Sequence, residues 1–461
     1  MRDWKRRDLL KLGLAPAMAS WLKPLASAAN PLNPAGFDEA AMAARVRREF
    51  LHAWNGYKRY AWGHDELRPL SKTARDWHGV SLLMTPVDAL DTMLLMGLDE
   101  EAKTTTDYIA KNLSFDRDIF VKNFEITIRL LGGLLSGYQM TNDDRLLALA
   151  DNLGKRLLPA FDSKTAMPYM HVNLKTGAVR GDVSNPAEIG TLLIEFGTLA
   201  KLTGEPTYYN KAKRGLTELY RWRSKIGLVG SGINVNTGEW TNTRSHISGL
   251  IDSYYEYLLK GWLLFDDEDC AAMWRASVET LHKHVAHEAT TGLWYGTVDM
   301  HTGARVATRF GALDAFFPGV LALAGDIDRA RRLQESCYKM WLVAGIEPEA
   351  LDYSTMKIIS AGYPLRPEIM ESAYYLYYFT RDPLYREMGV TFFEALVKHC
   401  RTDAGYAALR NVETKEKRDN MESFFLAETL KYLYLLFSPR EAIDLKTTVF
   451  NTEAHPLRKK W

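Results

Sequence analysis

Cysteine is scarce in this sequence of 461 residues, which contains only Cys270, Cys337 and Cys400. Three cysteines cannot all pair, and none of them are spaced as Cys-x-x-Cys. The sequence therefore lacks the pattern of a disulfide framework, a zinc ribbon or a dithiol redox motif. We expect three buried thiols.

An excess of charge of either sign is also missing. The 58 lysines and arginines nearly balance the 57 aspartates and glutamates, and like charges do not form blocks. We therefore expect no binding to nucleic acid or to an anionic membrane. The sequence also lacks a Gly-x-Ser-x-Gly nucleophile elbow, a Walker loop and a Gly-x-Gly-x-x-Gly turn, which argues against a serine hydrolase, a P-loop enzyme and a dinucleotide-binding enzyme.

The apolar run near the N-terminus is too short, and too interrupted by a lysine and a proline, to span a bilayer. It follows the pair Arg6 and Arg7 and is followed by an Ala-x-Ala site that ends at Ala28, as in a twin-arginine export signal. We expect residues 1–28 to be such a signal and the protein to be exported to a bacterial periplasm or secreted. The alternative is a basic amphipathic helix. Residues 37–461 are expected to form a single catalytic domain.

Helical periodicity recurs along most of the chain and predicts about fourteen helices. Most of them come as pairs joined by short turns, such as "LTGEPTYY" (202–209) and "LAGDIDRA" (323–330). Longer loops between the pairs contain "KTG", "NTG" or "HTG" between short alternating runs, which predicts small β-hairpins. This pattern indicates an all-α ring of about seven helical hairpins.

Each apolar member of a helix pair carries an acidic residue near its start. A single acid at such a place is ordinarily a helix cap or a partner of the helix dipole. As a set, however, the acids would converge on one cavity if the inner helices enter it from one end, and like charges that close need protons or a cation. Separated carboxylates around a cavity are also what glycoside hydrolysis requires, because one protonates the leaving oxygen and another activates water. The acids are Asp88, Asp91, Glu125, Glu188, Asp252, Asp314, Glu368, Glu371 and Glu422.

Several long motifs resemble the signature segments of one known family, the class I α-1,2-mannosidases of glycoside hydrolase family 47. The resemblance implies an exo-acting, inverting, Ca²⁺-dependent α-1,2-mannosidase that removes terminal α-1,2-linked mannose from high-mannose glycans or mannans. It also implies an (α/α)7 barrel with a C-terminal hairpin that plugs it. The motifs are "VDALDTMLLMGL" (87–98), "NFEITIRLLGGLLSGY" (123–138), "DSYYEYLLKGW" (252–262), "LRPEIMESAYYLYYFTRD" (365–382), "MESFFLAETLKYLYLLF" (421–437) and "FNTEAHPL" (450–457).

The resemblance also implies roles for individual residues. Glu125 in "NFEITIR" matches the general acid, Glu368 in "LRPE" matches the general base, and Asp252 in "DSYYEYL" matches a third catalytic carboxylate. Which of Glu125 and Asp252 donates the proton stays open. Arg129 lies one helical turn after Glu125, so it either forms an ordinary ion pair, orients the acid or grips a sugar hydroxyl. The expected substrate-binding residues are Arg129, Arg366, Phe424 and Leu250.

The last motif implies the metal site. In this family the corresponding threonine, here Thr452, binds Ca²⁺ through its hydroxyl and its carbonyl oxygen. Ca²⁺ takes about six to eight oxygen ligands, so two from the protein leave a shell of waters, two of which mannose hydroxyls can replace. The acids that match those holding the waters are Glu371, Glu428 and Glu453, with Glu188 as a further candidate.

Some positions differ from other members of the family. Gly311 and Ala312 stand where the family usually has an Asp-His pair, so a contact near the sugar is missing. Cys337 matches half of a disulfide in eukaryotic relatives, but Ala315 stands at the other half, so we predict no bridge. Leu250 matches the Golgi-type enzymes, whereas the endoplasmic-reticulum branch has an arginine there. A leucine offers no hydrogen bond and less bulk, which predicts a wider and less selective cleft.

Two alternative functions fit the same fold. One is a glycan-binding protein with weak or no hydrolysis, which the missing Asp-His pair would allow. The other is a different (α/α)-barrel enzyme, such as an epimerase, against which the Thr452 motif argues. The expected partners are α-1,2-linked mannose oligosaccharides, and the expected oligomeric state is a monomer.

Overall fold

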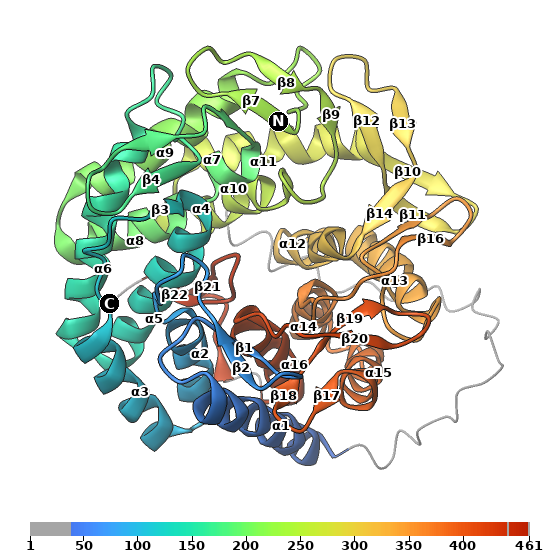
Figure 1. Cartoon of the computed structure of the whole chain (residues 1–461). Coiled ribbons are helices and arrows are strands. Elements are labelled where there is room, and N and C mark those ends of the chain that lie inside the picture. The colour runs from blue at the N-terminus through green and yellow to red at the C-terminus, as the bar shows by residue number, and fades with distance from the viewer. Residues whose placement is uncertain (1–37, 440–441, 460–461) are drawn as a thin grey trace.

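The structure, a computed structural model, describes residues 38–439 and 442–459. The predicted export signal, residues 1–28, lies outside the described residues and stays a prediction. Within the described ranges, no helix is both long enough and apolar enough to cross a membrane. The chain folds mainly into helices, which Figure 1 shows arranged in a ring, with short hairpins between them.

One set of helices faces the inside of the ring. These helices are buried on nearly all sides, which explains why their segments read as continuous apolar stretches rather than as narrow stripes. Successive members of the set along the chain contact one another. The set consists of α2 (Met84–Leu95), α5 (Gly132–Thr141), α8 (Leu193–Thr203), α10 (Asp252–Phe265), α12 (Phe317–Leu323), α14 (Glu368–Thr380) and α16 (Leu430–Phe437).

A second set lies outside the first. In α6, for example, the buried residues Leu146, Ala150, Leu153 and Leu157 recur at helical spacing and form one apolar face. Most outer helices pack against the inner helix that precedes them in the chain, but α1 packs against α16, so the two ends of the described chain meet. The set consists of α1 (Glu39–Tyr60), α3 (Asp99–Asn112), α6 (Asp144–Leu157), α9 (Pro206–Arg221), α11 (Glu268–Thr280), α13 (Ile327–Leu342) and α15 (Leu384–His399).

Short helical segments adjoin several of these helices. Two of them are π-helical turns directly before inner helices, a feature that is frequent at functional sites. The π turns are η2 (Thr127–Leu131), η4 (Leu281–Val285) and η6 (Phe425–Thr429). The other short segments are α4 (Asn123–Ile126), α7 (Pro186–Gly190), and the 3₁₀ turns η3 (Leu158–Phe161) and η5 (Ala312–Phe316).

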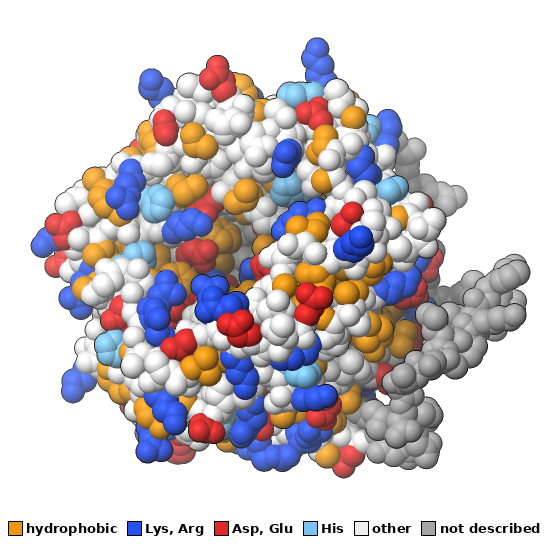
Figure 2. Space-filling model, turned by 45° about the vertical axis from the view of Figure 1, so that its right-hand side comes forward, with side chains coloured by type: hydrophobic (Ala, Val, Ile, Leu, Met, Phe, Trp, Pro, Cys, Tyr) orange, Lys and Arg blue, Asp and Glu red, His pale blue; other side chains and the backbone are white. Residues whose placement is uncertain are grey.

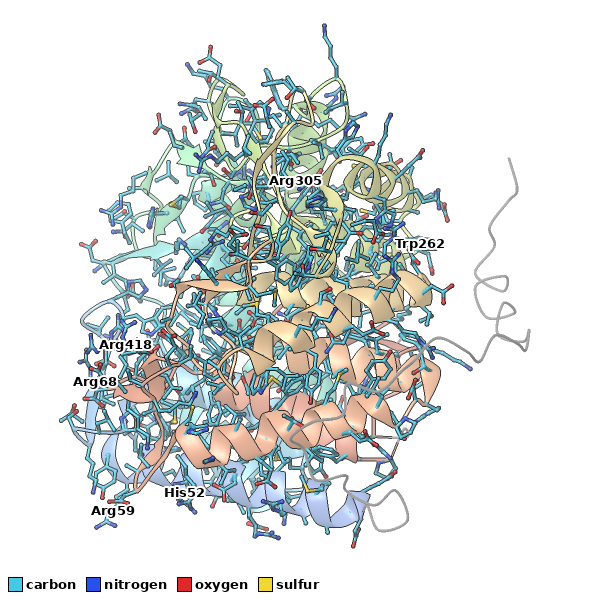
Figure 3. All side chains as sticks on the ribbon, turned by 90° about the vertical axis from the view of Figure 1, so that its right-hand side faces the viewer. His52, Arg59, Arg68, Trp262, Arg305 and Arg418 are labelled. Atoms are coloured by element: carbon cyan, nitrogen blue, oxygen red, sulfur yellow. The ribbon has the colours of Figure 1, made fainter. Side chains whose placement is uncertain are left out.

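The strands form small antiparallel sheets, many of them at one end of the helices. Figure 3 shows Arg68 and Arg418, both on strands, at that end, and Trp262, near the end of α10, at the other. The strands are β1 (Glu66–Arg68), β2 (Thr73–Arg75), β3 (Phe120–Lys122), β4 (His171–Asn173), β5 (Val179–Arg180), β6 (Val183–Ser184), β7 (Gly232–Asn234), β8 (Trp240–Asn242), β9 (Arg244–Ser245), β10 (Ala286–Ala289), β11 (Gly292–Tyr295), β12 (Thr297–Asp299), β13 (Arg305–Ala307), β14 (Arg309–Gly311), β15 (Ala350–Asp352), β16 (Lys357–Ser360), β17 (Arg401–Thr402), β18 (Gly405–Tyr406), β19 (Ala408–Asn411), β20 (Glu416–Arg418), β21 (Thr448–Phe450) and β22 (Pro456–Arg458).

The sequence predicts this organisation well, with differences at some helix starts. Helical periodicity predicts helix starts near Ile247, Phe310 and Met421. In the structure the first of these helices begins at Asp252, and the other two helical segments begin after a strand and a bridge. The physical reason is that Phe310 pairs with Leu351 in a sheet, so it cannot open a helix. The short strands make the fold mainly helical rather than all-α. The three cysteines are buried and free, as predicted.

The contact between α1 and the β17–β18 turn gives a test of this packing. A Cβ on Gly56 of α1 would lie 1.7 Å from the carbonyl oxygen of Ala404. Gly56→Ala should therefore force the backbones apart and destabilise the protein by about 1–3 kcal/mol or more. Gly362→Ala is the matched control, because its Cβ would meet only one atom, at 3.8 Å. Equal denaturant midpoints for the two variants would contradict the packing.

Candidate active site

A cavity of about 690 Å³ lies inside the ring and opens toward the hairpins. Figure 2 shows a hollow in the surface bordered by acidic, basic and apolar side chains. Every residue that the sequence singled out for a catalytic, metal or substrate role lines this one cavity. They are Glu125, Arg129, Glu188, Leu250, Asp252, Arg366, Glu368, Glu371, Phe424, Glu428, Thr452 and Glu453. Their placement together is observed, and their individual roles stay predictions.

The acids reach the cavity because the inner helices begin beside it. Asp252 and Glu368 are the first residues of α10 and α14, and Glu188 lies in the first turn of α7. Not every acid predicted to face the cavity does so. Asp88, Asp91 and Glu422 are absent from its lining, and Asp88 and Asp91 lie in a buried ion network behind it. Sequence spacing places an acid near a helix start, but it does not decide which side of the helix the acid faces.

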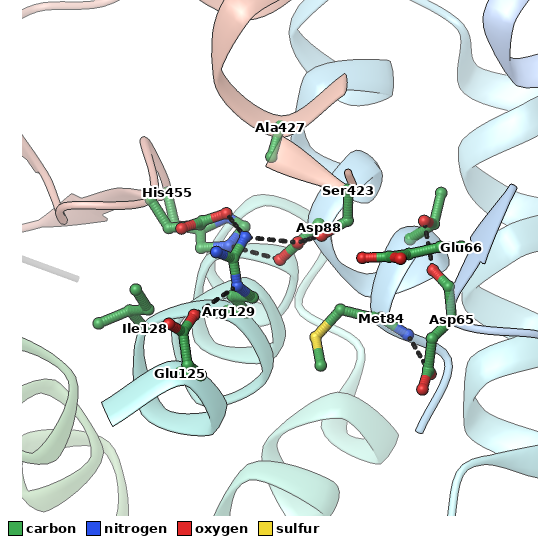
Figure 4. Close-up of polar contacts among 12 residues, drawn as sticks. Asp65, Glu66, Met84, Asp88, Glu125, Ile128, Arg129, Ser423, Ala427 and His455 are labelled. Atoms are coloured by element: carbon green, nitrogen blue, oxygen red, sulfur yellow. Dashed lines mark hydrogen bonds and ion pairs between the residues drawn. The ribbon is translucent and has the colours of Figure 1, made fainter. Parts of the chain in front are cut away.

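Arg129 binds three acids at once. Its Nε donates to Glu125 Oε2 at 3.0 Å, its Nη1 pairs with Glu453, and Asp88 Oδ2 lies 3.6 Å from Nη1. Figure 4 shows the guanidinium between Glu125 and Asp88, and the hydroxyl of Ser423 donates to the same Oδ2 of Asp88. The ion pair between Glu125 and Arg129, one of the alternatives that their spacing left open, is therefore one edge of a larger network. This network fixes the direction of the Glu125 carboxyl group.

Asp252 and Glu368 are partly buried carboxyl groups at helix starts. Burial raises the pKa of Asp252 to about 6, although the N–H and hydroxyl of Ser253 oppose the shift. Burial likewise raises the pKa of Glu368 to about 7, against the opposing charge of Arg366, whose Nη1 lies 4.0 Å away. The position of Glu368 in the first turn of a helix predicts an ionised carboxylate, because free N–H groups and the helix dipole lie there. The loss of water outweighs this effect, so the pKa of Glu368 is raised rather than lowered.

Thr452 lies in the turn between β21 and β22, and this turn is held from several sides. Its backbone N–H donates to the hydroxyl of Tyr257 at 3.2 Å, while its own hydroxyl has no hydrogen-bond partner among the described residues. Asn451 Oδ1 accepts the N–H groups of Glu453 and His455 at 2.9 and 2.8 Å, which closes the turn. The side-chain hydroxyl of Thr452 is therefore left free at the edge of the cavity.

Two buried lysines hold the same turn. Lys431 Nζ donates to the carbonyl of Ala454 at 2.6 Å and pairs with Asp91 at 2.7 Å. Lys260 pairs with Glu256, and its Nζ lies 3.5 Å from the carbonyl oxygen of Asn451. Each ammonium group is neutralised by its own acid, so the two lysines position the backbone on either side of Thr452 without adding net charge.

His455 connects the turn to α2. Its Nδ1 lies 2.6 Å from Asp91 Oδ2, and its Nε2 lies 3.4 Å from Asp88 Oδ1. Burial alone would lower the pKa of His455, but the two aspartates raise it to about 9. The imidazole is therefore charged at neutral pH and ties the hairpin to the ring.

The cavity around Thr452 fits a cation. Burial raises the pKa of Glu371 and of Glu453 to about 8, and burial together with the charges of Glu453 and Glu368 raises the pKa of Glu428 well above its usual value. A cation bound among them would restore their ionised forms. The acids are too dispersed to form a direct ligand set: no group of three His, Cys, Asp or Glu side chains in the described ranges could hold a metal ion by itself. A site built on Thr452 oxygens and water, with carboxylates behind the water, fits this chemistry.

Other lining residues suit a sugar. The ring of Phe424 lies 5.7 Å from the guanidinium carbon of Arg129 and 5.9 Å from that of Arg366. An aromatic face between two fixed cations is a platform for the apolar side of a pyranose. Glu188 pairs with Lys122 at 2.7 Å, which occupies one of its oxygens. Leu250 is 52% exposed and has a left-handed backbone with φ of 79°, so its side chain stays at the rim.

Sequence reasoning missed several residues of this site. Glu256 lines the cavity one helical turn after Asp252, and the four-residue spacing on α10 was a usable signal for it. Lys260 and Lys431 had only the weak signal of a lysine inside an otherwise apolar segment. Asp314 lines the cavity as expected of its helix start, and it accepts the N–H of Gly311 at 2.5 Å.

Comparisons with known proteins agree with these motifs. The family model described as Glycosyl hydrolase family 47 matches residues 49–459. The chain is 40% identical over 448 residues to Alpha-mannosidase I MNS4 of Arabidopsis thaliana, covering 91% of this chain and 70% of that protein. It is 38% identical over 444 residues to the Endoplasmic reticulum mannosyl-oligosaccharide 1,2-alpha-mannosidase of Mus musculus, covering 89% and 67%. A solved structure of an alpha-1,2-mannosidase from Trichoderma reesei superposes with a TM-score of 0.85 at 28% identity, covering 92% of this chain and all of that one.

These relatives come from a plant, a mammal and a fungus, so they give no support to the bacterial origin that the N-terminus suggested. The family match spans most of the chain, and the helical fold is that of the solved mannosidase. The chain therefore belongs to glycosyl hydrolase family 47, the class I α-1,2-mannosidases.

Proposed function

We propose that this chain is an exo-acting, Ca²⁺-dependent α-1,2-mannosidase that hydrolyses terminal α-1,2-linked mannose with inversion. The observation that carries the proposal is the single cavity in which Thr452 lies together with Glu125, Asp252 and Glu368. The relatives named above carry the names of α-mannosidases, which supports mannose oligosaccharides as the substrate. Digestion of an α-1,2-linked mannobiose, with and without a chelator, tests it.

The hydrolytic step uses two carboxyl groups. Glu368 takes a proton from water as the water oxygen attacks the anomeric carbon, and the bond to the leaving oxygen breaks on the opposite face of the sugar. A second carboxyl group protonates the leaving oxygen, so the charge balances. A bound Ca²⁺, held by Thr452 and by waters on Glu371, Glu428 and Glu453, would supply a Lewis acid that fixes mannose hydroxyls. Phe424 supports the ring during this step.

The proton donor is either Glu125 or Asp252. The raised pKa of Asp252, about 6, gives it a larger protonated fraction near neutral pH than an ordinary aspartate has. The bond from Arg129 fixes the direction of the Glu125 carboxyl group, which suits an acid that works through a water. Both residues therefore stay in the proposed mechanism.

We further propose that the ring closes as an (α/α)7 barrel plugged by the β21–β22 hairpin, and that the enzyme works as a monomer. Contacts between α2 and η6, and between α1 and α16, support closure. Contacts of β21 with α10 and of β22 with α5 support the position of the hairpin inside the ring.

A glycan-binding protein with little hydrolysis is the second candidate. It is favoured by Gly311 and Ala312, which replace the usual Asp-His pair and offer no polar side chain to the sugar. Binding of mannobiose without release of mannose, at saturating Ca²⁺, would establish this alternative. Turnover at a rate typical of enzymes would exclude it.

Removal of the metal should abolish turnover, and Ca²⁺ should restore it. Thr452→Ala should weaken Ca²⁺ binding by roughly 10–100-fold, measured by calorimetry and by the Ca²⁺-induced rise in thermal midpoint. The fold should change little, because the lost hydroxyl has no partner among the described residues and the backbone bond to Tyr257 remains. Thr176→Ala, in another hairpin turn, is the control. Full activity in a metal-free sample would contradict the proposed Ca²⁺ dependence.

The first product should be β-mannose. Glu368→Gln should lower kcat by about 10²–10⁴-fold while substrate still binds, because only the base is lost. NMR of the fresh product identifies the anomer, and Glu335→Gln, exposed on α13, is the control. Initial α-mannose would indicate retention and contradict the mechanism.

Leu250 should govern the order in which branches are trimmed. Leu250 does not fill the rim of the cavity as the arginine of the endoplasmic-reticulum enzymes would. The enzyme should therefore trim several arms of a nine-mannose N-glycan and remove the terminal mannose of the middle arm last. Leu250→Arg should shift trimming toward that middle-arm residue. Chromatography of timed digests gives the order. Selective removal of the middle-arm mannose by the unmodified enzyme, or an unchanged order in the variant, would refute the role.

A further inference from the structure

The basic residues that line the cavity fall into two groups. Lys122 pairs with Glu188, Arg129 pairs with Glu125 and Glu453, and Arg366 pairs with Glu349 at 2.7 Å. The second group consists of Arg244 and Arg309. Both line the same cavity and are exposed, and neither guanidinium group forms an ion pair or a hydrogen bond with a described residue.

The local structure explains why these two arginines are unpaired. Arg244 on β9 stands opposite Asp299 on β12, and Arg309 on β14 stands opposite Asp352 on β15. Both aspartates instead accept hydrogen bonds from residues close to their own turns. Asp299 accepts from Thr243 and from the N–H groups of residues 301 and 302, at 3.0 Å each. Asp352 accepts from Thr308 at 2.8 Å and from Ser354 at 2.7 Å.

Other nearby groups do not neutralise the pair. Asp314 is buried and bonded to the N–H of Gly311, and although the charge of Arg309 acts on it, the two do not form an ion pair. His246 also lines the cavity, and burial together with Arg309 and Arg244 lowers its pKa to about 4. It is therefore uncharged at neutral pH. Neither guanidinium group is therefore neutralised by a direct ion pair with a described residue, although the charge of Asp314 acts on Arg309.

Arg244, Arg309, Thr297 and Ala307 line the cavity from strands, whereas Asp252, Glu368 and Glu371 line it from the starts of helices. A terminal mannose held among the acids leaves the rest of the glycan to extend toward the opening. The unpaired guanidiniums therefore face the part of the substrate that leaves after cleavage.

We propose that Arg244 and Arg309 bind a phosphate group on the leaving-group side of the glycan, so that mannose oligosaccharides carrying a phosphate there are preferred substrates. A guanidinium group matches phosphate oxygens in a bidentate geometry and gives charge-assisted bonds, about twice as strong as those to neutral hydroxyls. A neutral glycan would leave both charges unbalanced. This inference deepens the proposed mannosidase function and rests on it.

The test compares two disaccharides that differ only in the phosphate. One is α-1,2-mannobiose, and the other carries a phosphate on the 6-hydroxyl of the reducing mannose. At low ionic strength, kcat/KM of the unmodified enzyme should be about tenfold or more higher for the phosphorylated substrate, mainly through a lower KM. In Arg244→Gln/Arg309→Gln this ratio should fall to about one or below. Added salt should lower the ratio only in the unmodified enzyme.

Arg48→Gln/Arg214→Gln is the matched control, because it removes two exposed arginines of outer helices that do not line the cavity. It should keep the full ratio. The thermal midpoint of Arg244→Gln/Arg309→Gln shows whether the double variant is folded. The two single variants are assayed in the same way, in case the double variant does not fold. A ratio near one in the unmodified enzyme, or an unchanged ratio in the double variant, would overturn the inference. If neither disaccharide is cleaved, the proposed mannosidase function fails, and calorimetric dissociation constants for the two disaccharides still decide the phosphate preference.

Discussion

The crowding of carboxyl groups where the inner helices begin is the constraint on which the rest of the structure depends. Taking so many acids out of water is unfavourable unless each finds a cation, a proton or a metal. Arg129, Lys260 and Lys431 supply buried cations to some of them. The others respond by a raised pKa, as in Glu371 and Glu453. A divalent cation bound among these acids would therefore offset part of the cost of burying them.

The position of Thr452, the candidate Ca²⁺ ligand in the C-terminal hairpin, depends on the assembled ring. The turn at Thr452 is held by side chains from α2, α10 and α16, which lie far apart in the sequence. None of these bonds exists until those helices are assembled. Ca²⁺ binding should therefore be linked to the folding of the whole ring, since a cation that binds only this arrangement stabilises all of it. The apolar residues Val449 and Phe450 bury the hairpin and make this link tight.

Periodicity in the sequence predicted most helix pairs, because inner and outer helices bury different fractions of their surface. The acids at helix starts predicted a shared cavity, and motif resemblance supplied Thr452. The sequence could not show that Asp88 and Asp91 turn away from the cavity, because that depends on helix rotation set by packing. Nor could it show the state of Glu368, where burial outweighs the helix dipole. No pattern in the sequence pointed to Arg244 and Arg309. They lack ion pairs because Asp299 and Asp352, which stand opposite them, accept hydrogen bonds from their own turns.

The cavity is thus lined by acids on helices and by Arg244 and Arg309 on strands. Glu349 connects the two sets. Ala312 donates its N–H to the carbonyl of Glu349 at 3.2 Å, and the carboxylate of Glu349 holds Arg366, which lies beside Glu368. The strand that carries Arg309 is therefore connected to Glu368 through one backbone bond and one ion pair. Ala312 takes part in this connection through its backbone, so the side chains at 311 and 312 can differ without removing the support of Arg366 beside Glu368.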